Sequence, residues 1–117
     1  MPAYLALEDL PEGVEVIGLD RDGRFPLDPD VPVVIGRASF CHIRVKGALI
    51  GGRQNCRFMC RPDGQWIVEH MGHSIPVIVN DTPLEGPRSA ELHDGDIIRP
   101  LTNSPDPGPS FRFVIES

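Results

Sequence analysis

Two cysteines and two histidines in the middle of the chain are residue types that bind zinc. Cys56 and Cys60 are separated by three residues, and His70 and His73, separated by two, begin ten residues later. Residues 55–61 have the composition of a β-strand, which would hold the two cysteines about 13 Å apart at a rise of about 3.3 Å per residue. Zinc holds its ligands within about 2.0–2.3 Å of the metal. One cysteine and one histidine could meet across a hairpin, but four ligands could not converge, so we expect no metal and no cofactor.

Ser39, Cys41 and His42 bring a hydroxyl, a thiol and an imidazole close together along the chain. Catalysis requires a nucleophile and a base in hydrogen-bonding geometry, which neighbouring positions do not supply. A glycine-flanked nucleophile, a P-loop and a dinucleotide-binding motif are all missing from the sequence. We therefore predict that the protein is not an enzyme. The odd number of cysteines and the lack of a signal-peptide pattern at the start favour reduced thiols and a cytoplasmic protein.

The charged residues are segregated along a chain whose net charge is −6. Residues 31–61 contain five arginines, one lysine and no acid, whereas 1–30 and 62–117 each carry a net charge of −6. An acid-free basic segment in an acidic protein indicates local anion binding, and the alternative is that its arginines pair with acids on neighbouring strands. The overall negative charge disfavours nucleic acid as a partner.

The elements that must position these residues are short strands. Twelve glycines and thirteen prolines leave residues 37–46 as the longest stretch without either type, which excludes a helical bundle. A hydrophobic content of 40% excludes disorder, and no apolar run is long enough to span a membrane. Turn-forming residues separate runs that predict strands at 4–7, 14–19, 24–27, 33–36, 42–45, 55–61, 65–70, 77–79, 96–99 and 111–116. The PDG sequence at 62–64 predicts a hairpin, and residues 1–117 are expected to form one all-β domain.

Five sequence motifs, in order, resemble the forkhead-associated (FHA) domain. They are Val33-Val-Ile-Gly-Arg37, the segment ending at Phe58, Trp66 to Ser74, Val79-Asn80, and Leu92-His-Asp-Gly-Asp-Ile-Ile98. The resemblance extends over about residues 4–116. It implies an FHA-like (SMAD/FHA-type) β-sandwich of two twisted antiparallel sheets with ten to eleven strands. It also implies recognition loops at one end and a function in binding phosphothreonine peptides.

The resemblance also assigns the binding site residue by residue. The family's arginine falls on Arg37, whose guanidinium suits phosphate oxygens. Gly52 replaces the phosphate-binding serine and is followed by the basic Arg53, and Asn55 replaces the family's histidine. In the second loop His73 replaces a serine, Ser74 retains a hydroxyl, and Ile75 replaces an asparagine. The predicted peptide- or phosphate-binding residues are Arg37, Gly52, Arg53, Asn55, His73 and Ser74.

Two functions follow from this partial match. The missing serine and asparagine favour a protein-interaction module with phospho-independent or altered recognition, such as a scaffold in a secretion or signalling assembly, with a homodimer among the options. The alternative is that Arg37 and Arg53 bind a phosphorylated or otherwise acidic peptide of a protein partner in signalling. Each hydrogen bond lost to a charged group costs about 1.5–3 kcal/mol, so two losses could abolish a micromolar site.

Overall fold

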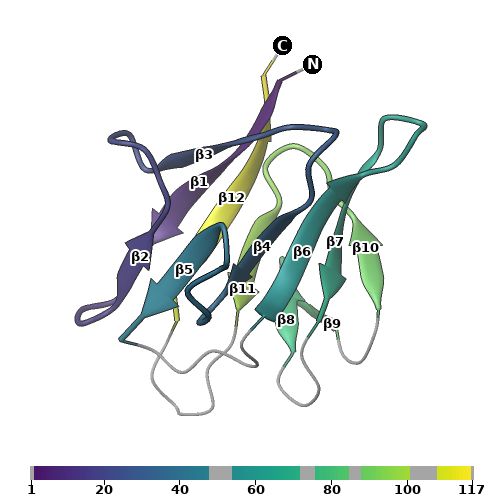
Figure 1. Ribbon diagram of the computed structural model, residues 1–117. Coiled ribbons are helices and arrows are strands. Elements are labelled where there is room, and N and C mark those ends of the chain that lie inside the picture. The colour runs from purple at the N-terminus through teal and green to yellow at the C-terminus, as the bar shows by residue number, and fades with distance from the viewer. Residues whose placement is uncertain (1, 48–53, 72–75, 85–87, 101–107, 117) are drawn as a thin grey trace.

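The computed structural model describes residues 2–47, 54–71, 76–84, 88–100 and 108–116, and these form two packed β-sheets (Figure 1). The described segments contain no helix, and therefore none that could cross a membrane. The twelve strands are β1 (Ala3–Asp9), β2 (Glu15–Ile17), β3 (Arg24–Leu27), β4 (Val33–Gly36), β5 (Ile43–Lys46), β6 (Gln54–Cys60), β7 (Trp66–His70), β8 (Val77–Val79), β9 (Thr82–Leu84), β10 (Ser89–Glu91), β11 (Ile97–Pro100) and β12 (Ser110–Ile115). This confirms the predicted β-sandwich.

Each layer is a six-stranded sheet. The first, called the β1 sheet, has the strand order β3-β1-β12-β11-β8-β9, and the second, called the β6 sheet, has the order β10-β7-β6-β4-β5-β2. Every pairing is antiparallel except one: β4 and β5 run parallel, with Ile35 beside Ile43 and Gly36 beside Arg44. The prediction of purely antiparallel sheets was therefore wrong at this pair, where the short connection 37–42 brings the chain back to run beside β4.

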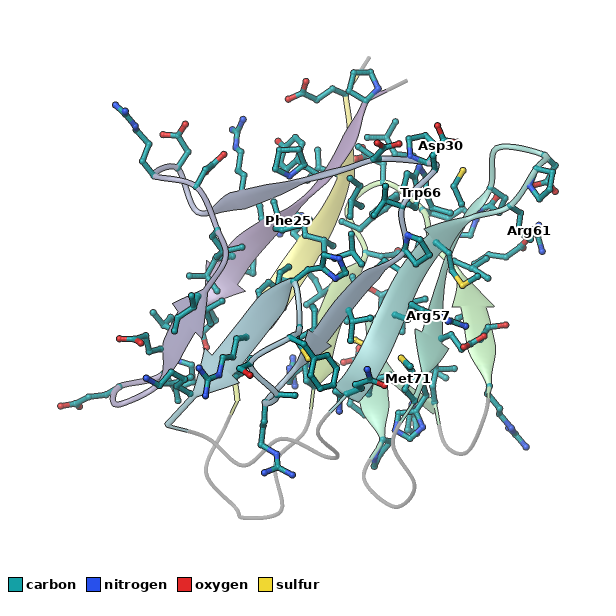
Figure 2. All side chains as sticks on the ribbon, in the orientation of Figure 1. Phe25, Asp30, Arg57, Arg61, Trp66 and Met71 are labelled. Carbon is teal, nitrogen blue, oxygen red and sulfur yellow. The ribbon has the colours of Figure 1, made fainter. Side chains whose placement is uncertain are left out.

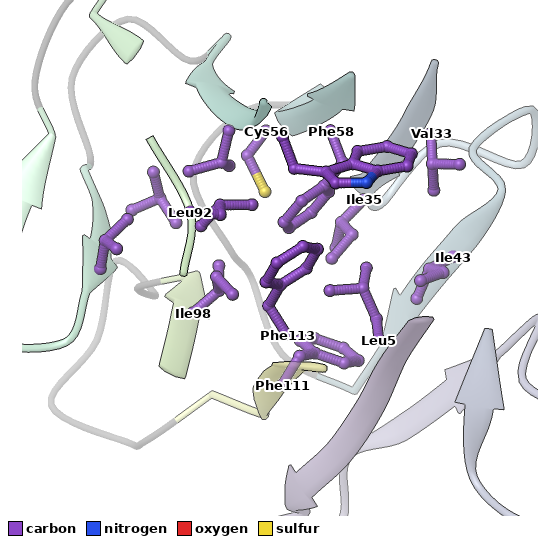
Figure 3. Packing of buried hydrophobic residues seen from close by; sticks show 14 of the residues in the cluster. Leu5, Val33, Ile35, Ile43, Cys56, Phe58, Leu92, Ile98, Phe111 and Phe113 are labelled. Atoms are coloured by element: carbon purple, nitrogen blue, oxygen red, sulfur yellow. The ribbon is translucent and has the colours of Figure 1, made fainter. Parts of the chain in front are cut away.

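The core lies between the sheets because alternate residues of each strand point inward. Figure 3 shows Leu5, Phe111 and Phe113 of the β1 sheet facing Ile35 and Phe58 of the β6 sheet, all with no exposed surface. The indole of Trp66 packs on Phe113 with 6.3 Å between ring centroids. The five phenylalanines do not all belong to this core, because Phe40 is 62% exposed in the β4–β5 connection.

Two of the described glycines with positive φ show why glycine is needed at their positions. Gly64, at φ +89°, closes the predicted β6–β7 hairpin, where Gln65 N–H donates to the Asp63 carboxylate (3.0 Å). Gly47, at φ +81°, follows β5, and a Cβ there would lie 2.1 Å from the carbonyl oxygen of Gly13. The hairpin was predicted correctly, and Gly47 marks a close approach of two backbone segments.

Two strands were not predicted. Asn80-Asp81-Thr82-Pro83 has the composition of a tight turn, but only Asn80 and Asp81 turn, with Asn80 at φ +55°, and β9 then pairs with β8. β9 contains Pro83 and is an edge strand, the position in which a sheet tolerates proline. β10 is likewise a three-residue edge strand, paired with β7.

The two ends of the sandwich differ. Near the chain termini, Glu116 N–H donates to the carbonyl oxygen of Pro2 (2.8 Å). At the opposite end, which we call the distal end, β4, β5 and β7 finish and β6 and β8 begin (Figure 1). The connections β4–β5, β5–β6 and β7–β8 therefore all leave the sandwich at the distal end.

Candidate functional site

Two of the six predicted site residues can be placed in the structure. Arg37 and Asn55 lie within the described segments. Gly52 and Arg53 belong to the β5–β6 connection, and His73 and Ser74 to the β7–β8 connection. These four residues lie outside the described residues. The strand ends that flank them lie at the same end as Arg37, which is the arrangement that the resemblance implied (Figure 1).

Arg37 is held at the centre of the β6 sheet by its neighbours. It follows Gly36, the last residue of β4, and Gly36 pairs with Arg44 of β5 on one side and Gln54 of β6 on the other. The Arg37 residue is half-buried. Its backbone is anchored by a second arginine, because Arg44 Nε donates to the main-chain oxygen of Arg37 (3.2 Å). Two guanidinium-bearing residues are thus joined at the distal end of β4 and β5.

Arg44 is a candidate site residue that was not among those predicted from the sequence. Ile43 and Val45 are buried, so the alternation of β5 turns Arg44 to the outer face of the sheet. Its neighbour on β4 is Gly36, which has no side chain and leaves room for the guanidinium to cross toward Arg37. The alternation was visible in the sequence. The parallel pairing that places Gly36 beside Arg44 was not.

Asn55, the second predicted site residue within the described segments, is buried. It is the second residue of β6, and its side chain has no exposed surface. The main-chain carbonyl oxygen of Asn55 accepts a hydrogen bond from Met71 N–H (2.8 Å), just beyond the end of β7. Asn55 therefore joins the two strand ends from which the β5–β6 and β7–β8 connections leave, and in this conformation it supports the distal surface from inside.

The arginines of the acid-free segment divide into two groups. Arg57 pairs with Glu69 on β7 (2.7 Å), and Arg61 pairs with Glu91 on β10 (2.7 Å) and Asp63 (3.2 Å). The hydrogen bond to Glu91 raises the pKa of Arg61, so this guanidinium is firmly charged. For these two arginines the cross-strand alternative was right. Figure 2 shows Arg61 toward the β6–β7 hairpin and Met71 toward the opposite end of the same two strands.

Arg44 belongs to the second group. Among the described residues its guanidinium makes no ion pair with a carboxylate, and its one side-chain hydrogen bond is to the main-chain oxygen of Arg37. Lys46, two residues further along β5, is exposed and also lacks a described acid within ion-pair distance. Among the described residues, arginines of the segment 31–61 thus form ion pairs with acids at mid-sheet and at the hairpin, whereas Arg44 and Lys46 of β5 form none.

The cysteine and histidines considered for metal binding and catalysis are buried or bonded to the backbone where the structure describes them. Cys56 lies opposite His70 on the β6–β7 ladder, and both are buried. Burial raises the pKa of the Cys56 thiol far above its ordinary value, which leaves it a poor ligand or nucleophile. His42 Nδ1 accepts a hydrogen bond from Val34 N–H (3.1 Å). Within the described segments no three metal-ligating side chains gather, and His73 lies outside them.

Comparisons with known proteins agree with this architecture. A family model described as the FHA domain matches residues 33–99, more than half of the chain. No curated protein sequence matches the chain.

Solved FHA domains share the fold over almost its full length. The FHA domain of an Arabidopsis thaliana hypothetical protein is 22% identical, with a TM-score of 0.70 over 99% of this chain and 86% of that one. The N-terminal FHA domain of S. cerevisiae Rad53p, solved in complex with a phosphothreonine peptide, is 13% identical, with a TM-score of 0.72 over 99% and 94%. The FHA domain of the CT664 protein from Chlamydia trachomatis is 17% identical, with a TM-score of 0.69 over 98% and 99%. With the family model matching the segment from β4 to β11, the chain belongs to the FHA domain family.

Proposed function

We propose that this FHA domain binds a phosphorylated or otherwise acidic peptide of a protein partner at its distal end, with Arg37 as the anchor. The observation that carries the proposal is the hydrogen bond from Arg44 to the main-chain oxygen of Arg37. This contact brings a second cation to the strand end where the family places its arginine, and Arg44 has no carboxylate partner among the described residues. Guanidinium groups match phosphate oxygens in geometry and charge.

The recognition we propose is an altered form of phosphothreonine binding. Gly52 lacks the hydroxyl that the family uses for phosphate. Part of that role falls instead to Arg53 and to the backbone N–H groups of Gly51 and Gly52. His73 and Ser74 are proposed as neighbours of the bound peptide from the β7–β8 connection. Asn55 is proposed as a support for both connections, because it is fully buried and accepts the hydrogen bond of Met71.

Binding without phosphate is the second candidate. The replacements at Gly52, His73 and Ile75 favour it, since they remove hydroxyl and amide groups that would hold a phosphopeptide. In that case the domain serves as a scaffold in a secretion or signalling assembly. A cytoplasmic location is part of both proposals, and the three free thiols support it because cysteines stay reduced in that compartment.

The test is a titration of fluorescent peptide libraries in three matched forms: phosphothreonine, threonine and glutamate at the same position. We expect the phosphorylated form to bind best and Arg37→Ala to lose binding by about tenfold to a hundredfold, which corresponds to about 1.5–3 kcal/mol for a charged hydrogen bond. Arg44→Ala should weaken binding as well. Arg24→Ala, which removes the same charge from the β1 sheet, is the control and should bind like the parent.

The outcomes separate the two candidates. If no phosphorylated peptide binds, or if Arg37→Ala binds as the parent does, the phosphopeptide proposal is wrong. If a partner binds equally in its phosphorylated and unphosphorylated forms, the scaffold function is favoured instead. Raising the salt concentration should weaken the proposed interaction, because it depends on exposed charges.

A further inference from the structure

The outer face of the β1 sheet carries side chains that the proposed peptide site does not use. Strand alternation turns Tyr4 of β1 and Val114 of β12 outward as direct neighbours. The next row across the sheet places Ala6 of β1, Arg112 of β12 and Ile97 of β11 side by side. All five are half-buried. Apolar residues with tyrosine and arginine form the mixture that is enriched at protein–protein interfaces.

A hollow of about 440 Å³ opens on the distal half of this face, with Asp9, Ile97, Arg99 and Ser110 in its lining. In its wall, Arg112 donates two hydrogen bonds to the Glu8 carboxylate (2.7 and 3.0 Å), so these two charges neutralise each other. Asp9 and Arg99 are both exposed, and neither makes an ion pair with any described residue. Within the described part of the chain, the hollow therefore has one negative and one positive group that form no ion pair.

The strand registers put these two groups at symmetric positions. Asp9 lies beside Ser110 on the β1–β12 ladder. On the other side of β12, Ile97 pairs with Arg112 and Ile98 with Phe111, and one more step along the same register brings Arg99 beside Ser110. Asp9 and Arg99 thus flank Ser110 at the same height, two strand spacings or about 10 Å apart. In this conformation they make no ion pair with each other.

A two-fold axis parallel to β12 would bring this face against its own copy. Such an axis places β1 of one copy against β11 of the other, so Asp9 meets Arg99 of the second copy, and the same pair forms twice. The operation also sets Ala6 against Ile97 of the second copy. The neutral pairs of Glu8 and Arg112 lie near the axis. A surface that is complementary to itself in this way is what an isologous dimer interface requires.

We propose that the outer face of the β1 sheet is a homodimer interface, held by two reciprocal Asp9–Arg99 ion pairs and by apolar contacts between Ala6 of one copy and Ile97 of the other. The area of this face limits how tightly two copies can bind. Five strands at about 4.8 Å and five residues at about 3.4 Å give roughly 400 Å² of flat surface, below the ~800 Å² per partner of a standard stable interface. The dimer is therefore weak and concentration-dependent.

The symmetry has a functional consequence. An axis parallel to the strands leaves both distal ends pointing in the same direction, so the dimer presents two peptide sites side by side. A partner that carries two recognition motifs would then engage both sites and gain affinity through effective concentration, without any new contact.

Sedimentation velocity and light scattering over a wide range of protein concentration at low salt test the interface. We expect the parent domain to dimerise as concentration rises, and Asp9→Arg or Arg99→Asp alone to weaken dimerisation by at least about tenfold, because each puts like charges opposite one another. The double variant Asp9→Arg/Arg99→Asp restores the pairs with reversed sign and should dimerise again.

Glu12→Arg and Arg21→Asp make the same charge changes at exposed positions that belong neither to a strand of the β1 sheet nor to the lining of the hollow, and they should leave the dimer intact. Thermal melts confirm that each variant is folded. A parent domain that stays monomeric at every concentration overturns the proposal. It is also overturned if the single reversals have no effect, or if the double variant behaves like the single ones.

Discussion

Gly47 is the residue at which the end of β5 meets the start of β2, and its replacement by alanine tests how closely these strands are joined. Its φ of +81° is unfavourable for alanine, and the added Cβ would lie 2.1 Å from the carbonyl oxygen of Gly13. Ordinary contacts of this kind begin at 3.4 Å, so the two backbone segments would have to separate by about 1.3 Å (3.4 minus 2.1). The β2–β5 ladder has three residue pairs and begins at Glu15 and Lys46 beside this contact, so such a movement breaks part of it.

A comparison with Gly64 gives the expected loss of stability. Gly64 also has positive φ, at +89°, but no atom lies within 4 Å of the position of its Cβ. Gly64→Ala should therefore lose only the conformational preference, about 1–2 kcal/mol. Gly47→Ala should lose that amount and about 2 kcal/mol more for the displaced backbone and weakened ladder, giving about 3–4 kcal/mol in total.

Thermal unfolding by circular dichroism measures the difference. An unfolding entropy of about 2.1 cal/mol/K per residue converts 1 kcal/mol into about 4 °C for a domain of this size. We expect Tm to fall by about 4–8 °C for Gly64→Ala and by about 12–16 °C for Gly47→Ala. Hydrogen exchange should also accelerate at the β2 amides in Gly47→Ala only. Equal losses of Tm in the two variants would show that the β2–β5 junction adjusts at no cost, and would refute the reasoning.

Three further predictions concern the core, the pH dependence and the thiols. Phe113 is fully buried, so Phe113→Ala should lose about 3–5 kcal/mol in urea unfolding, and a loss below about 1 kcal/mol would contradict its central place. The Arg112 hydrogen bond lowers the pKa of Glu8 below 4.5, so ionised Glu8 stabilises the fold above that pH. Its contribution should be lost as pH falls through the lowered pKa, and Glu8→Gln should flatten this part of the stability–pH curve, whereas an unchanged curve would argue against the pair. Half-exposed Cys60 should react with iodoacetamide well before Cys56, which is buried and has a raised pKa, and equal labelling rates in mass spectrometry would exclude this order.

The strands that could be predicted from the sequence are those whose limits are encoded locally. Arg24–Leu27, Val33–Gly36 and Val77–Val79 have the predicted bounds because turn-forming residues flank runs of strand-forming side chains. Thr82–Leu84 could not be recognised, since Pro83 disfavours a strand and the segment becomes one only by pairing with β8. The parallel pairing of β4 with β5 was also beyond the sequence pattern, because a six-residue connection gives no local signal of strand direction.

At the distal end, too, some features could be predicted from the sequence and others depended on strand pairing. Arg37 was identified through the order of motifs around it, and the structure places it at the end of β4, between β5 and β6. Arg44 could not be identified, because its role depends on lying beside the side-chain-free Gly36 in the parallel pair. Asn55 was assigned by its position relative to Gly52, but sequence position carries no information on burial, and the structure shows its side chain inside the protein.

The first and last described residues lie side by side, because Glu116 N–H donates a hydrogen bond to the carbonyl oxygen of Pro2. A short linker could therefore join the two ends into a ring, and new termini could be opened at the β6–β7 hairpin, which lies away from the distal end. Because the two ends lie close together, the domain could also be inserted into a surface loop of another protein. The proposed peptide-binding surface at the distal end would then face away from the host protein.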